Sequence, residues 1–82
     1  MGYHKRQIIK GELGKVSKIR EELEELEDAI EQDNKILALC ELADLYGAIE
    51  HVLLGQFTDL TMEDLKVMSR ATSEAFQDGT RK

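Results

Sequence analysis

Apolar residues in the first half of the chain follow a helical period. They recur at intervals of three and four residues: Val16, Ile19, Leu23, Leu26 and Ile30. This spacing places apolar side chains on one face of an α-helix, whereas a half-buried β-strand requires strict alternation, which no segment shows. The pattern predicts an amphipathic helix over residues 13–32.

A second helix is predicted after a short polar break. Asp33 and Asn34 interrupt the apolar pattern, and residues 35–54 are then rich in Leu, Ala and Ile. Drawn as a helix, this segment is apolar on nearly every side, so we expect it to be buried, with Cys40 as a small buried hydrophobic residue. Because the connection is short, the first two helices should form an antiparallel pair.

The third predicted helix covers residues 61–77. Thr61 is followed three residues later by an acidic residue, Asp64, which is typical of a capping box. Gly79 then ends the helix. Residues 1–12 form a lead-in to the first helix, where glycines such as Gly11 are interpreted as flexible positions.

The length indicates a single domain over residues 1–82, and the three predicted helices make it all-α. A chain of 82 residues forms only a marginal core by itself, so we expect a partner subunit. Hydrophobic residues make up 41% of the chain and charged residues 34%, a mixture typical of a folded, soluble protein. No apolar run approaches the roughly 20 residues that span a bilayer, and no secretion signal is evident, so a cytoplasmic location without membrane contact is expected.

The formal net charge of −6 argues against a nucleic-acid partner, because proteins that bind phosphate backbones usually carry a basic surface. An acidic chain can nevertheless bind a polyanion when metal ions lie between the two sets of negative charge. The position of the acidic residues is therefore more informative than their number.

Two pairs of carboxylates are predicted to face each other across the antiparallel helices. Glu22 and Glu25 border the apolar stripe of the first helix, and Glu41 and Asp44 lie in the otherwise apolar second helix. Burying unpaired carboxylates is costly, and Lys18 alone cannot neutralise four of them. A cluster of oxygen ligands suits Mg²⁺ or Mn²⁺, and Mg²⁺ commonly completes its shell with phosphate oxygens.

The remaining acidic residues of the first helix are expected on a solvated face. On a helical projection these side chains point away from the second helix: Glu21, Glu24, Glu27 and Asp28. From spacing alone, a solvated surface and a metal site both remain open for the acidic residues as a group.

The order of the acidic residues resembles a known signature. Glu21-Glu22-Leu23-Glu24-Glu25 is followed after 15 intervening residues by Glu41-Leu42-Ala43-Asp44, which is similar to the paired EExxE and ExxD motifs of MazG-like nucleotide pyrophosphohydrolases. The segments 14–20, 41–50 and 75–81 also resemble small, often phage-encoded members of that family. The resemblance covers most of the chain.

The resemblance implies a helical bundle completed by a homodimer or homotetramer. It implies Mg²⁺ ligation by Glu22, Glu25, Glu41 and Asp44, with Mn²⁺ as a substitute, and Glu21 or Glu22 as the catalytic residue. The implied reaction is hydrolysis of a nucleoside or deoxynucleoside triphosphate to the monophosphate and pyrophosphate. For a phage-encoded protein, the location would be the host cytoplasm.

Substrate contacts are less well defined by the sequence. Lys18 either touches a phosphate or forms an ion pair with Glu22, one turn away, and His51 is either a substrate contact or an ordinary surface histidine. Longer relatives carry basic residues near the end of the third helix, where this chain has Ala71, Glu74 and Ala75. The candidates to replace them are Lys66, Arg70, Arg81 and Lys82.

The sequence leaves two other functions open. One is a non-catalytic helical module whose acidic face binds a basic partner, and the other is a degenerate relative that binds nucleotide without hydrolysis. Glu41 and Asp44 lie within an otherwise apolar helix. An interaction module that binds through its surface does not require acidic residues there, so their placement favours a metal enzyme over such a module.

Overall fold

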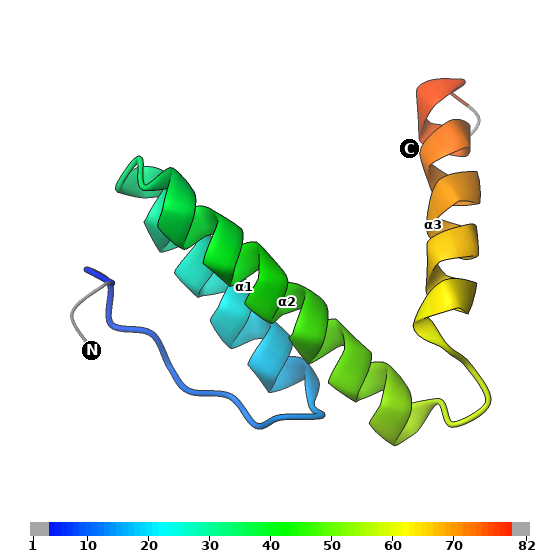
Figure 1. The fold of residues 1–82 in the computed structure, drawn as a ribbon, viewed down its shortest axis with the longest axis horizontal. Coiled ribbons are helices and arrows are strands. Elements are labelled where there is room, and N and C mark those ends of the chain that lie inside the picture. The colour runs from blue at the N-terminus through cyan, green and yellow to red at the C-terminus, as the bar shows by residue number, and fades with distance from the viewer. Residues whose placement is uncertain (1–3, 80–82) are drawn as a thin grey trace.

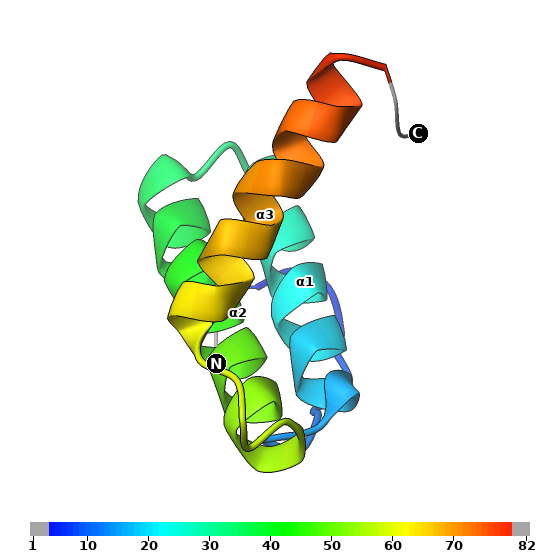
Figure 2. The same cartoon turned by 90° about the vertical axis from the view of Figure 1, so that its right-hand side faces the viewer.

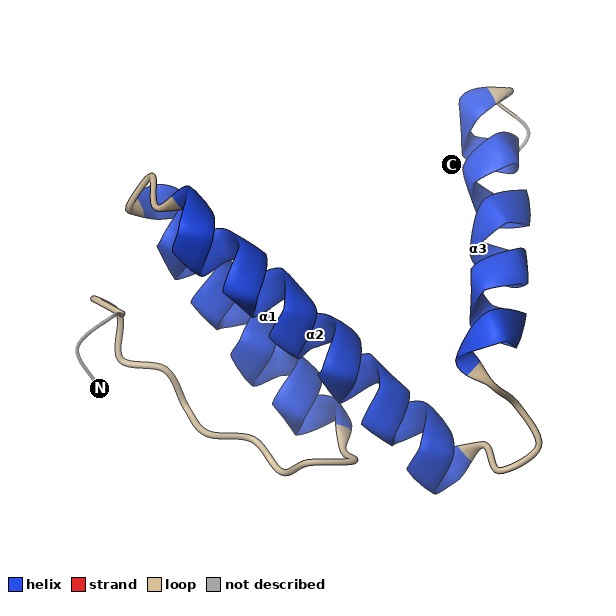
Figure 3. Ribbon diagram, in the orientation of Figure 1, coloured by secondary structure: helices blue, strands red, loops and turns tan. Residues whose placement is uncertain are grey.

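The computed structural model describes residues 4–79, and within that range it contains three α-helices and no strand. They are α1 (Val16–Glu31), α2 (Lys35–Gln56) and α3 (Met62–Gln77) (Figures 1 and 3). The prediction of an all-α chain with three helices is therefore confirmed. The helix ends differ from the predicted 13–32, 35–54 and 61–77 by a few residues.

The differences at the helix ends have local causes. Gly14 has φ of 88°, a left-handed conformation that an α-helix cannot contain, so α1 begins after it. The predicted stop at Leu54 is too early, because α2 continues through Gly55 to Gln56. Thr61 and Asp64 form the expected capping box: the Thr61 side chain accepts a hydrogen bond from the Asp64 N–H, and the Asp64 carboxylate accepts one from the Thr61 N–H.

α1 and α2 form an antiparallel hairpin with a tight connection. Asp33 has φ of 56°, and the side chain of Asn34 caps α2 by accepting a hydrogen bond from the Leu37 N–H at 3.0 Å. The connection therefore brings the two helices side by side along their lengths (Figure 1). This register places Glu22 and Glu25 next to Glu41.

The segment before α1 runs back along the hairpin in an extended conformation (Figures 1 and 3). Gly11 packs directly on the start of α1, where a Cβ atom would lie only 2.1 Å from the carbonyl oxygen of Ser17. The interpretation of Gly11 as a flexible position is therefore wrong. Glycine is needed there because only its backbone can approach α1 so closely.

The described residues bury very little apolar surface. The buried apolar residues are Ala29, Ala48 and Leu53, whereas the buried polar residues are all acidic: Glu21, Glu22, Asp28 and Glu41. An ordinary core of a folded domain has the opposite composition. The interior of the hairpin is thus organised around carboxylates rather than around an apolar core.

The expectation that α2 is buried is wrong for the single chain. Ile36 and Leu39 are 78% and 66% exposed, and Cys40 is exposed as well. α1 covers only one side of α2, and α3 extends away from the hairpin instead of packing along it (Figures 1 and 2). Three helices that do not close into a bundle cannot cover a helix that is apolar all round.

Within residues 4–79, no helix combines the length and the apolar character that crossing a membrane requires.

Candidate metal centre

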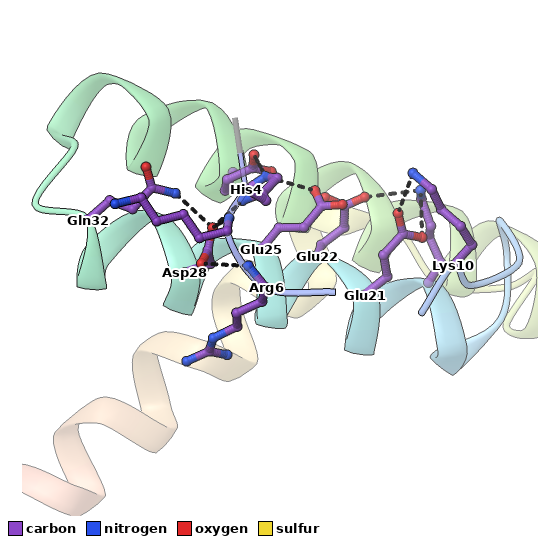
Figure 4. Close-up of polar contacts among 11 residues, drawn as sticks. His4, Arg6, Lys10, Glu21, Glu22, Glu25, Asp28 and Gln32 are labelled. Carbon is purple, nitrogen blue, oxygen red and sulfur yellow. Dashed lines mark hydrogen bonds and ion pairs between the residues drawn. The ribbon is translucent and has the colours of Figure 1, made fainter. Parts of the chain in front are cut away.

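The hairpin brings four carboxylates to one place. Glu22 and Glu25 come from α1, Glu41 and Asp44 come from α2, and one oxygen from each lies within 4.8 Å of the others. Figure 4 shows Glu22 and Glu25 side by side on α1, facing α2. These are the four residues that the sequence assigned to a metal. The fold of the hairpin brings them together.

Two of these carboxylates are buried, and in each only one of the two oxygens has a polar partner. Glu22 and Glu41 are each 5% exposed, and the Oε1 atom of each has no hydrogen-bond partner. Their Oε2 atoms are used: Glu22 contacts Lys18 Nζ at 3.0 Å, and Glu41 contacts His4 Nε2 at 2.8 Å. A buried polar atom without a partner costs about 1–3 kcal/mol, and more when it is charged. The two oxygens therefore offer acceptor positions to a cation, or to a proton held by the neighbouring carboxyl group of Glu25.

Glu25 shows the electrostatic consequence of this crowding. Burial, together with the neighbouring carboxylates of Glu41 and Glu22, raises the pKa of Glu25 to about 8. Like charges held this close favour the protonated form of one member. Near neutral pH the cluster without a cation therefore retains a proton, which a divalent ion would have to displace.

Asp28 is buried rather than solvated, which corrects the sequence expectation. It is 2% exposed and accepts hydrogen bonds from His4 Nδ1, from the backbone N–H groups of Lys5 and Arg6, and from Gln32 Nε2. Burial alone would raise the pKa of Asp28, but these hydrogen bonds, led by His4, hold it below its usual value. Asp28 therefore fixes the N-terminal segment on α1 (Figure 4).

Glu21 is also buried, at 2% exposed, which is the second correction to the predicted solvated face. One of its oxygens accepts from the Gly11 N–H at 2.8 Å and from Lys18 Nζ at 3.1 Å, and the other lies 3.6 Å from Lys10 Nζ. Burial favours the neutral acid, but the Gly11 hydrogen bond and the Lys18 charge outweigh it and lower the pKa of Glu21. Both oxygens are engaged, so Glu21 fastens the N-terminal segment and is poorly suited to accept a proton from water.

Lys18 and His51 lie beside the cluster. Together with Glu22 and Asp44 they line a cleft of about 360 Å³. Lys18 forms the i,i+4 ion pair with Glu22, one of the two alternatives left open by the sequence, and the His51 Nδ1 atom lies 2.9 Å from the Gly47 carbonyl oxygen. Both side chains are placed where a ligand in the cleft would meet them.

The other substrate-binding candidates are placed elsewhere. Lys66 and Arg70 are exposed on α3, and neither lines the cleft beside the carboxylates. Lys66 instead lines a cleft of about 480 Å³ between α2 and α3, together with Tyr46, Ile49 and Met62. Arg81 and Lys82 lie outside the described residues. The part of the chain that the structure describes therefore brings neither Lys66 nor Arg70 to the cluster.

His4 is the residue at the cluster that the sequence did not indicate. Its ring lies between Asp28 and Glu41, with Nε2 also 3.8 Å from a Glu25 oxygen. Burial opposes protonation, but the carboxylates of Asp28 and Glu41 raise the pKa of His4 above its usual value. No local pattern in residues 4–12 signals this contact, because it depends on the path of the segment along the hairpin.

Comparison of the chain with protein-family models, curated protein sequences and solved structures finds no significant match, so the assignment of the cluster depends on its geometry and chemistry and on the sequence pattern that carries it.

Proposed function

We propose that this chain is a magnesium-dependent hydrolase that converts nucleoside or deoxynucleoside triphosphates to monophosphates and pyrophosphate. The observation that carries the proposal is the pair of buried, unpartnered oxygens of Glu22 and Glu41 within a four-carboxylate cluster. The MazG-like arrangement of the same four residues supplies the class of reaction. An acidic interaction module does not account for carboxylates buried at the centre of a hairpin.

The cluster has dimensions that suit one hard cation. Mg²⁺ binds oxygen at about 2.0–2.1 Å, so two ligands on opposite sides of the ion are about 4.2 Å apart. The four carboxylates already lie within 4.8 Å of one another, and a small adjustment of side-chain torsions closes the difference. Mn²⁺ accepts the same donors with similar geometry. Mg²⁺ prefers to keep several non-protein ligands, which phosphate oxygens and water provide.

The surrounding residues fit the binding and hydrolysis of a triphosphate. A bound divalent ion neutralises phosphate charge and acidifies a water ligand. Asp44 is exposed at the cleft, so phosphate can approach the cluster from that side, and the Lys18 ammonium lies at the same opening. Of the two catalytic candidates, Glu22 keeps an unpartnered oxygen whereas both oxygens of Glu21 are engaged. This difference favours Glu22 over Glu21 as the carboxylate that acts at the metal site.

The function is tested by measuring pyrophosphate release from the common ribo- and deoxyribonucleoside triphosphates with Mg²⁺ and with EDTA. We expect release of pyrophosphate with at least one nucleotide, formation of the monophosphate in equal amount, and loss of both products in EDTA. Release of inorganic phosphate with a diphosphate product would assign a different reaction. A folded, metal-loaded protein that hydrolyses none of the nucleotides would favour a binding module or a degenerate relative.

We also propose that a second copy of the chain covers the exposed face of α2, as a homodimer or homotetramer. Support comes from the exposed apolar side chains on this helix, which include Ile36, Leu39, Leu42 and Tyr46. Monomeric proteins rarely leave such contiguous apolar surface in contact with water. A chain with so small a core gains the missing burial by self-association.

Self-association predicts a large effect of one charge on this face. Leu39→Glu should abolish the oligomer, because it places a carboxylate in an apolar interface, at a cost of several kcal/mol. Arg20→Glu, a charge change at an exposed polar position of α1, should leave the oligomer intact. The mass in solution, measured by light scattering, checks both variants. A wild-type protein that is monomeric and fully helical at micromolar concentration would contradict the proposal.

A further inference from the structure

The N-terminal segment delivers an imidazole to the edge of the carboxylate cluster. His4 Nε2 lies 2.8 Å from Glu41 Oε2 and 3.8 Å from Glu25 Oε2. His4, Glu25 and Glu41 form a group whose potential ligand atoms all lie within 4.8 Å of one another. This group shares Glu25 and Glu41 with the four-carboxylate cluster, so the two sets of ligands are adjacent.

The orientation of His4 is set by contacts on its other side. Its Nδ1 atom lies 2.8 Å from Asp28 Oδ2, and the Asp28 side chain is 2% exposed. The same carboxylate is fixed by the backbone N–H groups of Lys5 and Arg6. Without a metal, Nε2 lies at hydrogen-bond distance from Glu41, so both ring nitrogens pair with carboxylates. A cation that displaces the Nε2 proton would leave the Nδ1–H bond to Asp28 in place and would meet the Nε2 electron pair beside Glu25 and Glu41.

This arrangement is the one that proteins use for metal-bound histidines. Such a histidine donates its second ring N–H to a carboxylate, which fixes the tautomer and the ring orientation and makes the ligating nitrogen more basic. In Figure 4, His4 lies between Asp28 on one side and the glutamates of the cluster on the other. Asp28 is thus placed to orient the imidazole ring, and His4 is placed to bind an ion through Nε2.

We propose that His4 is a metal ligand and forms, with Glu25 and Glu41, a nitrogen-containing subsite for a divalent first-row transition ion. This inference rests on the proposed metal centre, which it extends by one residue from outside the hairpin.

The distances fit coordination by one ion. Neighbouring ligands of an octahedral ion with bonds of about 2.1 Å are about 3.0 Å apart, and opposite ligands about 4.2 Å apart. The separations from His4 Nε2 to the Glu41 and Glu25 oxygens, 2.8 and 3.8 Å, are close to that range. The Glu41 Oε1 atom, buried and without a partner, is a further oxygen for the same ion.

The donor set determines which ion is preferred. Imidazole nitrogen favours first-row transition ions, whereas Mg²⁺ favours oxygen ligands alone. The ratio of Mn²⁺ affinity to Mg²⁺ affinity should therefore be higher in the wild-type protein than in a variant without the imidazole. Loss of a histidine ligand or of its carboxylate support weakens metal binding by about 10–100-fold or more.

The experiment is electron spin-echo spectroscopy of the full chain loaded with Mn²⁺, which detects nitrogen bound directly to the ion. We expect a ¹⁴N coupling that changes to a ¹⁵N coupling when the protein is made with ¹⁵N-labelled histidine. His4→Gln should remove the coupling and lower the Mn²⁺ affinity. The chain has two histidines, so His51→Gln is the matched control and should retain the coupling.

The outcomes separate this inference from the proposed function. Mn²⁺ that binds without nitrogen coupling would overturn the role of His4 and show that the imidazole only pairs with the carboxylates when no metal is present. Loss of the coupling in His51→Gln would overturn it as well, because the ligand would then be the other histidine. Failure of the wild-type protein to bind Mn²⁺ or Mg²⁺ at all would instead reject the metal centre. The isotope exchange needs no substitution, so it stays decisive if His4→Gln does not fold.

Discussion

The Glu41→Gln variant is expected to lose nucleotide hydrolysis by more than about 100-fold, since changes even in the outer shell of a metal site cost about 10–100-fold. Glu41 is buried at 5% exposed and belongs to both groups of potential metal ligands. The amide keeps the size of the side chain but removes one negative charge and one oxygen. Rates of pyrophosphate release and calorimetric Mg²⁺ titrations of the same preparations measure the effect.

Glu27→Gln is the matched control for this substitution. Glu27 is on α1 and exposed, and its carboxylate pairs with Arg6 at 3.2 Å on the surface. The substitution makes the same chemical change outside the cluster, where a surface ion pair contributes about 0–1 kcal/mol, so activity and Mg²⁺ affinity should stay within about twofold of wild type. Equal losses in both variants would mean that net charge, rather than a site at Glu41, controls the reaction.

The helices could be predicted because their signals are local. Apolar spacing along residues 16–30 identified α1, and Thr61 with Asp64 identified the start of α3, where the capping box is present. Antiparallel pairing of the first two helices follows from their short connection. The proximity of Glu22, Glu25, Glu41 and Asp44 could be anticipated for the same reason, because two helical spacings and one tight turn determine it.

The surroundings of the cluster could not be predicted because they depend on the path of the N-terminal segment. Asp28 and Glu21 looked like surface residues on a helical projection, and each is buried by a segment that is itself held by their hydrogen bonds. Gly11 permits this path through a backbone contact that has no sequence pattern. His4 lies 24 residues from Asp28 along the chain. Contacts over such distances depend on tertiary packing, which periodicity does not describe.

α2 shows a different limit of sequence reasoning. Its apolar composition indicates that it is covered on all sides, but composition does not say by which chain. In the single chain, Leu39 and Tyr46 are exposed, so the composition of the helix agrees with the proposed assembly rather than with the fold of one copy. The predicted burial of α2 therefore depends on the predicted oligomer, and measuring the mass of the protein in solution tests both.

The Glu25→Gln variant is expected to stabilise the metal-free protein at alkaline pH. The pKa of Glu25 rises from 4.5 to about 8 in the folded chain, so protonated Glu25 contributes stability fully below pH 4.5, and this contribution is lost as the pH rises through about 8. Glutamine resembles the protonated form and does not ionise. The free energy of unfolding of the variant should thus equal that of wild type near pH 5 and exceed it near pH 9 by at least about 1 kcal/mol, a Tm increase of about 4–8 °C in a domain of this size.

Magnesium should reverse this order if the raised pKa of Glu25 reflects a cation site. The wild-type protein gains about 2.7 kcal/mol at a Mg²⁺ concentration of 100 times Kd, whereas Glu25→Gln lacks the charge and one oxygen and gains less. The measurement is thermal unfolding of both proteins at one protein concentration, at pH 5 and pH 9, each in EDTA and in Mg²⁺. Glu27→Gln is again the control. A variant that is destabilised at pH 9 in EDTA would show that Glu25 is paired with a cationic group of the protein. If the two stability curves cross on addition of Mg²⁺, the ion must hold together carboxylates that repel one another without it. A solvated acidic surface would not produce this crossing.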